Sequence, residues 1–124
     1  MPKILIVDDE PHIRLLLEQT LEELEDEGVE LLTAGNGIDA VNIVQREKPE
    51  LVFIDVMMPG MSGFDVCNKI KNEFGMKGLY LIMLTAKGQE VDREQGIKCG
   101  ADIYMTKPFN PDEILEKARG VLGL

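Results

Sequence analysis

Residues 51–60 (LVFIDVMMPG) constrain the fold of this chain more than any other stretch. Their first four residues form an apolar run rich in β-formers, which is typical of a strand buried on both faces in a parallel sheet. Asp55 ends the run, and Pro59 and Gly60 predict a turn. Because an unpaired carboxylate is costly to bury, Asp55 should lie at the carboxyl edge of the sheet, where open α/β folds bind ligands. The alternative is a solvated loop acid.

Short apolar runs and helical patterns alternate along the whole chain. Strands are expected at 3–7, 29–34, 51–54, 79–84 and 101–105. Helices are expected from Pro11 to the stop at Gly28, around 40–44 before Pro49, after the capping residue Ser62, over 89–99 and after the capping residue Asn110. This order predicts one α/β domain over residues 1–124, with a parallel sheet and right-handed crossovers.

Helical spacing also predicts which side chains face the core. In the first helix these are Ile13, Leu16, Leu17, Leu21 and Leu24, and in the third Val66, Cys67, Ile70 and Phe74. The segment 89–99 contains Gly96 and few apolar residues, so it should be the least stable helix. Cys67 and Cys99 fall in helical patterns without C-x-x-C spacing, which favours core thiols over redox centres.

Polar side chains gather where four of the expected strands end. Asp8 and Asp9 follow the first strand, Asp55 the third, Thr85 the fourth and Lys107 the fifth. Parallel strands end at one edge, so these groups should converge. Two carboxylates about 4 Å apart repel by roughly 4 kcal/mol at an effective dielectric of about 20. Lys107 and a divalent cation would relieve this repulsion. Mg²⁺ suits such a site because it takes one or two carboxylates and bridges to phosphate oxygens, with Mn²⁺ as an alternative.

A carboxylate beside Mg²⁺ and a lysine can attack phosphorus and form an aspartyl phosphate, which gives Asp55 a chemical role. Metal, ammonium, the Thr85 hydroxyl and nearby backbone N–H groups would stabilise the charge on the phosphoryl oxygens. The chain has no P-loop, G-x-S-x-G or H-E-x-x-H motif, which argues against nucleotide hydrolysis, serine acyl transfer and zinc proteolysis.

Composition narrows the class of partner. The net charge of −10 and pI of about 4.5 argue against a broad basic surface for nucleic acid. The acidic run at 22–27 is expected as a solvated helix end, with a docking patch as the alternative. His12 is expected at the surface, and one histidine with two distant cysteines forms no His/Cys metal site. Without a secretory signal pattern or a membrane-spanning apolar run, we expect a cytoplasmic protein that binds no membrane.

Four stretches closely resemble the receiver domain of response regulators in two-component signalling. They are 3–10 (KILIVDDE), 55–63 (DVMMPGMSG), 84–86 (LTA) and 100–109 (GADIYMTKPF), and the resemblance covers essentially the whole chain. It implies a flavodoxin-like, doubly wound (βα)5 sandwich with strand order 2-1-3-4-5. It also implies a histidine kinase or histidine phosphotransfer protein as phosphoryl donor and a downstream protein target. The chain would be a monomer or dimerise on phosphorylation.

The resemblance implies a metal and acceptor role for four residues. Asp55 matches the phosphoacceptor. Asp9 matches a direct Mg²⁺ ligand and Asp8 an acid that acts mainly through water. The backbone carbonyl of Met57 would complete the protein ligands.

Further matching residues belong to the switch. Lys107 matches the lysine that pairs with the phosphoryl group, and the peptide bond between Lys107 and Pro108 is expected to be cis. Thr85 matches the switch hydroxyl, with Ala86 beside it at the phosphoryl site. Tyr104 matches the aromatic residue that turns inward when Thr85 moves, and a static core aromatic is the alternative.

The chain departs from the family pattern at few positions. Ser62 replaces the usual aspartate after the Pro-Gly-Met turn, and serine caps a helix equally well. Met57 and Lys87 occupy two variable positions that tune dephosphorylation in this family. Lys87 is alternatively a solvated loop charge.

The leading hypothesis is a non-enzymatic switch: phosphorylation of Asp55 shifts the face formed by the fourth helix, fifth strand and last helix, which then binds a protein. A phosphorelay intermediate, or a receiver fragment of a larger regulator or hybrid kinase, also fits, although Met1 favours a free-standing chain. An aspartyl-phosphate phosphatase of the haloacid dehalogenase type would need an acid at Met57. A scaffold independent of phosphorylation is a third hypothesis.

Overall fold

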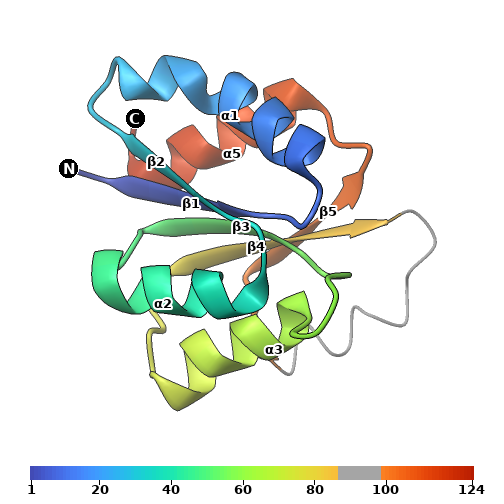
Figure 1. Ribbon diagram of the computed structural model, residues 1–124. Helices are drawn as coiled ribbons and strands as arrows, with labels where there is room; N and C mark the ends of the chain where they lie inside the picture. Colours follow the sequence, from blue (N-terminus) through green and yellow to red (C-terminus); the bar gives the residue numbers. More distant parts are fainter. Residues whose placement is uncertain (87–98) are drawn as a thin grey trace.

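The computed structural model describes residues 1–86 and 99–124 (Figure 1). The strands are β1 (Lys3–Val7), β2 (Glu30–Ala34), β3 (Leu51–Asp55), β4 (Tyr80–Ala86) and β5 (Ile103–Lys107). The helices are α1 (Pro11–Glu25), α2 (Gly37–Glu47), α3 (Gly63–Asn68) and α5 (Pro111–Leu122), and a π-helical turn, η1 (Lys69–Glu73), continues α3.

All neighbouring strands pair in parallel, and the sheet order is β2-β1-β3-β4-β5, as predicted. Helices α1 and α5 lie on one face of the sheet, and α2 and α3 lie on the other (Figure 1). Both faces of β1 and β3 are therefore covered, and every residue of β3 is buried. The buried parallel strands confirm the prediction from the continuous apolar runs, and the doubly wound α/β sandwich confirms what the family resemblance implies.

The alternation of side chains along β1 divides the core into two layers. Ile4 and Ile6 pack in the layer beneath α1 and α5, whereas Leu5 and Val7 pack in the layer above α2 and α3. Because β1 lies between β2 and the central strand β3, its carboxyl end lies beside that of β3. The polar residues that follow the strand therefore lie at the centre of one sheet edge.

Two strands run further than the sequence predicts. β4 extends through Thr85 to Ala86, and β5 covers 103–107 instead of 101–105. The later start of β5 has a side-chain cause: the Asp102 carboxylate accepts a hydrogen bond from Leu81 N at 2.7 Å, so the regular ladder begins one residue later. Lys107 is consequently the last residue of a strand and not part of the following loop.

The helices agree with expectation at one cap and differ in two places. The predicted capping box of α3 is present, with Asp65 N donating to Ser62 Oγ and Ser62 N donating to the Asp65 carboxylate. The predicted continuous third helix is wrong beyond Asn68, because it widens into η1. Leu16 was expected in the core but is 43% exposed, since the buried stripe of α1 follows Leu17, Leu21 and Leu24. The predicted helix over 89–99, with Gly96, lies outside the described residues except for Cys99.

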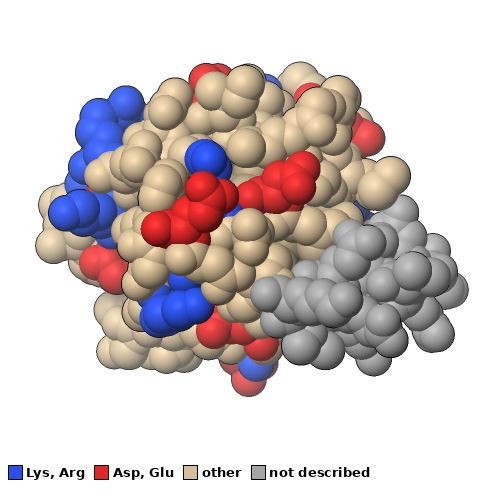
Figure 2. All heavy atoms as spheres, turned by 90° about the horizontal axis from the view of Figure 1, so that it is seen from below, with Lys and Arg blue, Asp and Glu red and all other residues tan. Residues whose placement is uncertain are grey.

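Charges of both signs mix on the molecular surface. On the face that carries α2 and α3, Lys and Arg side chains are interspersed with Asp and Glu (Figure 2). Within residues 1–86 and 99–124, no helix combines the length and apolar character needed to cross a bilayer.

Candidate functional site

The carboxyl ends of β1, β3 and β5 bring distant polar residues together. Asp55 is the last residue of β3 and Lys107 the last of β5, while Asp8 directly follows β1. Lys107 Nζ donates to Asp8 Oδ2 at 2.8 Å and to Asp55 Oδ1 at 3.0 Å. One ammonium group thus joins two carboxylates that the sequence separates by 47 positions from each other.

The sheet register explains how Lys107 reaches across β4. Asp55 is level with Leu84, and Leu84 is level with Met105, so Lys107 lies two residues beyond Asp55 along the strand direction. Residues two apart share a face, so Lys107 projects from the same face as Asp55. Its long side chain then folds back over the end of β4 to both acids.

Backbone contacts fix Asp8 within the site. Its carboxylate is fully buried, and Oδ1 accepts a hydrogen bond from Glu10 N at 2.9 Å. Its carbonyl accepts a hydrogen bond from Arg14 Nη1 at 2.7 Å. The turn after β1 is therefore held by α1, and a buried carboxylate with several donors is well compensated.

Burial and charge act in opposite directions on Asp55. The side chain is nearly enclosed, and this loss of hydration raises the pKa of Asp55, while the Lys107 ammonium lowers it and the nearby carboxylates raise it further. The pKa of Lys107 is also raised, because the stabilisation by Asp8 and Asp55 outweighs the opposing effect of burial. The pocket thus favours a positive charge beside its acids.

Three carboxylates form a group that fits a hard cation. Asp8, Asp9 and Asp55 each offer an oxygen, and these oxygens lie within 4.8 Å of one another. Asp9 is exposed, whereas the other two acids are buried, so the group opens to solvent on one side. An all-oxygen donor set with room for water is typical of Mg²⁺ sites.

The remaining predicted residues belong to β4, to β5 and to the segment that follows β3. Thr85 is almost buried in β4, and Tyr104 is half-buried in β5 against the core layer of α2 and α3. Met83 pairs with Tyr104, so Thr85 and Tyr104 project from the same face of the sheet, opposite to the face of Asp55. Met57 is 61% exposed just after β3. Thr85 and Tyr104 therefore lie on one face of the sheet, and Asp55 and Lys107 lie on the other.

Two further predicted residues and the predicted cis peptide bond can be placed as follows. Ala86 ends β4 level with Lys107. Lys87 lies outside the described residues. The Lys107–Pro108 peptide bond is cis.

Sequence reasoning missed several supporting residues. Arg14 contacts the Asp8 carbonyl, and Gly63 packs so closely on the backbone of β3 that an added Cβ would lie 3.0 Å from Val56 Cα. Lys71 and Asp102 form an ion pair of 2.9 Å at the far end of β4. A lysine within the apolar spacing of the third helix was the one available signal for Lys71.

Comparisons with known proteins agree with this geometry. A family model described as the response regulator receiver domain matches residues 4–119. The alkaline phosphatase synthesis transcriptional regulatory protein PhoP of Bacillus subtilis (strain 168) is 41% identical over 120 residues, which are 97% of this chain and 48% of PhoP. The chain spans about half the length of the curated relatives it matches.

Solved structures give the same result. The receiver domain of the Francisella response regulator 1452 has a TM-score of 0.85 at 27% identity, with 99% of this chain and 98% of that chain covered. The chemotaxis protein CheY4 of Vibrio cholerae has a TM-score of 0.84 at 32% identity, with 98% of both chains covered. The chain therefore belongs to the family of response regulator receiver domains of two-component systems.

Proposed function

We propose that this chain is a phosphoacceptor that takes a phosphoryl group onto Asp55 and acts as a protein switch. The observation that carries the proposal is the shared Lys107 ammonium, which lies 3.0 Å from Asp55 and 2.8 Å from Asp8. The proposed donor is the phosphohistidine of a histidine kinase or phosphotransfer protein. The proposed setting is the cytoplasm.

Asp55 is the nucleophile in this mechanism. One carboxylate oxygen attacks phosphorus, the bond from phosphorus to the donor histidine breaks, and the histidine leaves with the electron pair of that bond. Lys107 is already oriented to neutralise the growing charge on the phosphoryl oxygens, and the ionised form of Asp55 is favoured by the same ammonium. Positioning and charge therefore supply the catalysis, without a general base.

Asp8, Asp9 and Asp55, with the Met57 carbonyl, are the residues proposed to hold Mg²⁺. When bound, Mg²⁺ would screen the repulsion among the acids and stabilise charge on the transferred group. Glu10 N holds the Asp8 carboxylate, and Arg14 holds the Asp8 carbonyl. Asp9 faces solvent, which leaves room for water.

Phosphorylation would redistribute the contacts of the pocket. A phosphoryl group on Asp55 brings new acceptor oxygens and charge within reach of Lys107. We propose that Thr85 and Ala86 bind these oxygens and that Tyr104 follows Thr85, because both side chains project from one face of the sheet. Met57 and Lys87 are proposed to set the lifetime of the phosphoryl group. The altered surface around β5 and α5 would then bind or release a protein.

The wider context has two forms. PhoP is a transcriptional regulatory protein about twice the matched length, whereas CheY4 matches this chain along 98% of its length. A free-standing regulator, a phosphorelay intermediate and the receiver part of a longer regulator or hybrid kinase all use the same pocket. In all three forms we propose that residues 1–124 contact neither nucleic acid nor membrane. Association with a second copy would follow phosphorylation.

A phosphatase is the competing class. It would need a proton donor beside the nucleophile, and Met57 supplies none. Multiple-turnover release from p-nitrophenyl phosphate would favour that class over the switch.

The deciding experiment is labelling with acetyl phosphate and Mg²⁺, read by intact mass. The wild-type chain should gain one phosphoryl group, and Asp55→Asn should gain none. Glu116→Gln, an exposed change on α5, is the matched control and should label like the wild type. Undiminished labelling of Asp55→Asn would refute the acceptor assignment. Partner binding that is unchanged by beryllofluoride, a mimic of the phosphoryl group, would favour a scaffold.

A further inference from the structure

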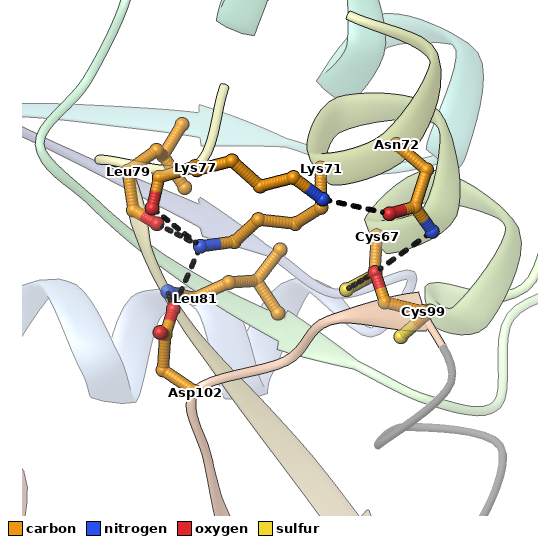
Figure 3. Close-up of polar contacts among 8 residues, drawn as sticks. All are labelled: Cys67, Lys71, Asn72, Lys77, Leu79, Leu81, Cys99 and Asp102. Carbon is orange, nitrogen blue, oxygen red and sulfur yellow. Dashed lines mark hydrogen bonds and ion pairs between the residues drawn. The ribbon is translucent and has the colours of Figure 1, made fainter. Parts of the chain in front are cut away.

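Two buried cysteines lie together in the fold. Cys67 belongs to α3, and Cys99 precedes Gly100 just before β5. Cys67 Sγ donates a hydrogen bond to the Cys99 carbonyl at 3.4 Å, so the two residues are in direct contact. Figure 3 shows both sulfur atoms in the gap between the third helix and the segment entering β5. They are not joined by a disulfide.

The surroundings hold this pair in place. Asn72 Nδ2 donates to the same Cys99 carbonyl at 3.5 Å. Gly100 has a φ of 95° and packs on the Lys71 side chain, whose ammonium contacts the Leu79 carbonyl and pairs with Asp102 at 2.9 Å (Figure 3). Cys99 lies 32 residues after Cys67 in the sequence, and these contacts hold it beside the third helix.

The two thiols are chemically unequal. The neighbouring Cys67 side chain lowers the pKa of the Cys99 thiol, with backbone N–H groups and the Lys71 ammonium acting in the same direction against burial. The Cys99 side chain and burial together raise the pKa of Cys67. Cys99 retains 4% exposure and Cys67 none. Cys99 is therefore the thiol that an oxidant meets first and in the more reactive form.

We propose that Cys67 and Cys99 are a redox pair that closes to an intramolecular disulfide on reaction with hydrogen peroxide. The Cys99 thiolate attacks the outer peroxide oxygen, the O–O bond breaks, and hydroxide leaves and takes up the proton of the medium, which gives Cys99 sulfenic acid. The Cys67 sulfur then attacks the Cys99 sulfur, the S–O bond breaks, and the hydroxyl leaves as water with the Cys67 proton. One peroxide and two thiols thus yield one disulfide and two waters.

Closure would tie α3 to the entrance of β5. β5 carries Tyr104 and Lys107, and Tyr104 packs against the same core layer as Cys67 and Cys99. A covalent tether at this point would restrict movement of β5 relative to α3. In a reducing compartment such a bond forms transiently and reports oxidation, which is the usual role of a disulfide there.

The test counts thiols in the folded chain of residues 1–124. The protein is treated with hydrogen peroxide, unfolded in guanidinium with N-ethylmaleimide and weighed intact. Because the chain contains two cysteines, the expected product carries no maleimide and lacks two hydrogen atoms, and dithiothreitol should restore two alkylation sites. Two alkylated cysteines after treatment, or disulfides only between chains, would overturn the proposal.

Single variants test the order of the steps. In Cys67→Ala, Cys99 should accumulate as sulfenic acid and take up dimedone, whereas in Cys99→Ala, Cys67 should stay largely unmodified. Thermal melts of both variants check folding, and the wild-type thiol count stands independently of them. Equal dimedone uptake at both cysteines would overturn the assigned order. This readout does not depend on phosphorylation of Asp55, so it fails or succeeds separately from the proposed function.

Discussion

Lys107 Nζ lies 3.0 Å from Asp55 Oδ1, although 52 residues separate the two along the chain and a whole strand separates them in the sheet. The same ammonium contacts Asp8 at 2.8 Å. Each acid is buried, so the pair is screened less by water than a surface ion pair. This contact joins the carboxyl ends of β3 and β5. Because Asp55 is buried there, the free energy of unfolding depends on whether Asp55 is ionised.

The first prediction concerns pH. Burial raises the pKa of Asp55 above its usual 3.8, so the folded state binds this proton more tightly than the unfolded state. Below about pH 3.8 Asp55 is protonated in both states, so its burial does not lower the free energy of unfolding through charge. As the pH rises through the pKa of Asp55 in the folded state, the buried carboxylate ionises and the free energy of unfolding falls. In buffer with a chelator, Asp55→Asn should therefore be more stable than the wild type at pH 7, by an increment that shrinks towards pH 4.

Urea unfolding of both proteins at several pH values measures this increment. An Asp55→Asn advantage that grew as pH fell would contradict the raised pKa. Glu116→Gln, on the exposed side of α5, should show no such trend.

The second prediction concerns metal removal. If Asp8, Asp9 and Asp55 hold Mg²⁺, free Mg²⁺ at about 100 times its dissociation constant should stabilise the fold by about 2.7 kcal/mol, and a chelator should reverse the gain. Asp9→Asn removes an exposed ligand without opening the core, so it should keep the fold and lose most of the gain. Asp26→Asn, on the far end of α1, is the control that should retain it. Equal Mg²⁺ stabilisation of Asp9→Asn would remove this residue from the ligand set.

The third prediction concerns the buried cation of η1. Lys71 is 2% exposed, and its ammonium contacts the Leu79 and Lys77 carbonyls besides Asp102. Lys71→Met leaves these acceptors without their donor and should cost about 3 kcal/mol of unfolding free energy.

The matched control for Lys71→Met is Lys69→Met, two residues earlier. Lys69 pairs with Glu73 at 3.4 Å on the exposed side of the same turn, so its loss should cost no more than about 0.5 kcal/mol. Chemical denaturation of both variants gives the two values. Similar costs for the two variants would mean that burial of Lys71 contributes nothing.

The fourth prediction concerns the glycine that follows the capping residue of α3. A Cβ at Gly63 would press on the Asp55 carbonyl and lie 3.0 Å from Val56 Cα, both of which are backbone atoms that cannot rotate away. Gly63→Ala should therefore cost about 2 kcal/mol and slow phosphorylation by displacing Asp55.

Gly120→Ala is the control for this change. A Cβ at Gly120 meets nothing within 4 Å inside α5, so the substitution should stabilise by up to about 1 kcal/mol. Thermal melts and acetyl phosphate labelling report the two effects separately. A neutral Gly63→Ala would show that the turn after β3 can move without affecting Asp55.

Local pattern predicted the elements of this fold well. The run at 51–54, the capping box of Ser62 and Asp65, and the alternation of strands with helices all depend on contacts between residues a few positions apart. The resemblance of four stretches to receiver domains predicted the strand order as well. Residue-level roles at the acidic pocket stay predictions until phosphorylation is measured.

The sequence by itself determined which segments become strands and helices, because the periods of 2 and 3.6 and the capping hydrogen bonds are local. Only the tertiary structure decided that β5 begins at Ile103, that Leu16 faces solvent, and that Lys71 is buried. Two of these depend on partners far along the chain: the start of β5 on the contact between Leu81 and Asp102, and the burial of Lys71 on its pairing with Asp102. The register of β5, and with it the reach of Lys107 to Asp55, depends on contacts that form only once the whole sheet is assembled.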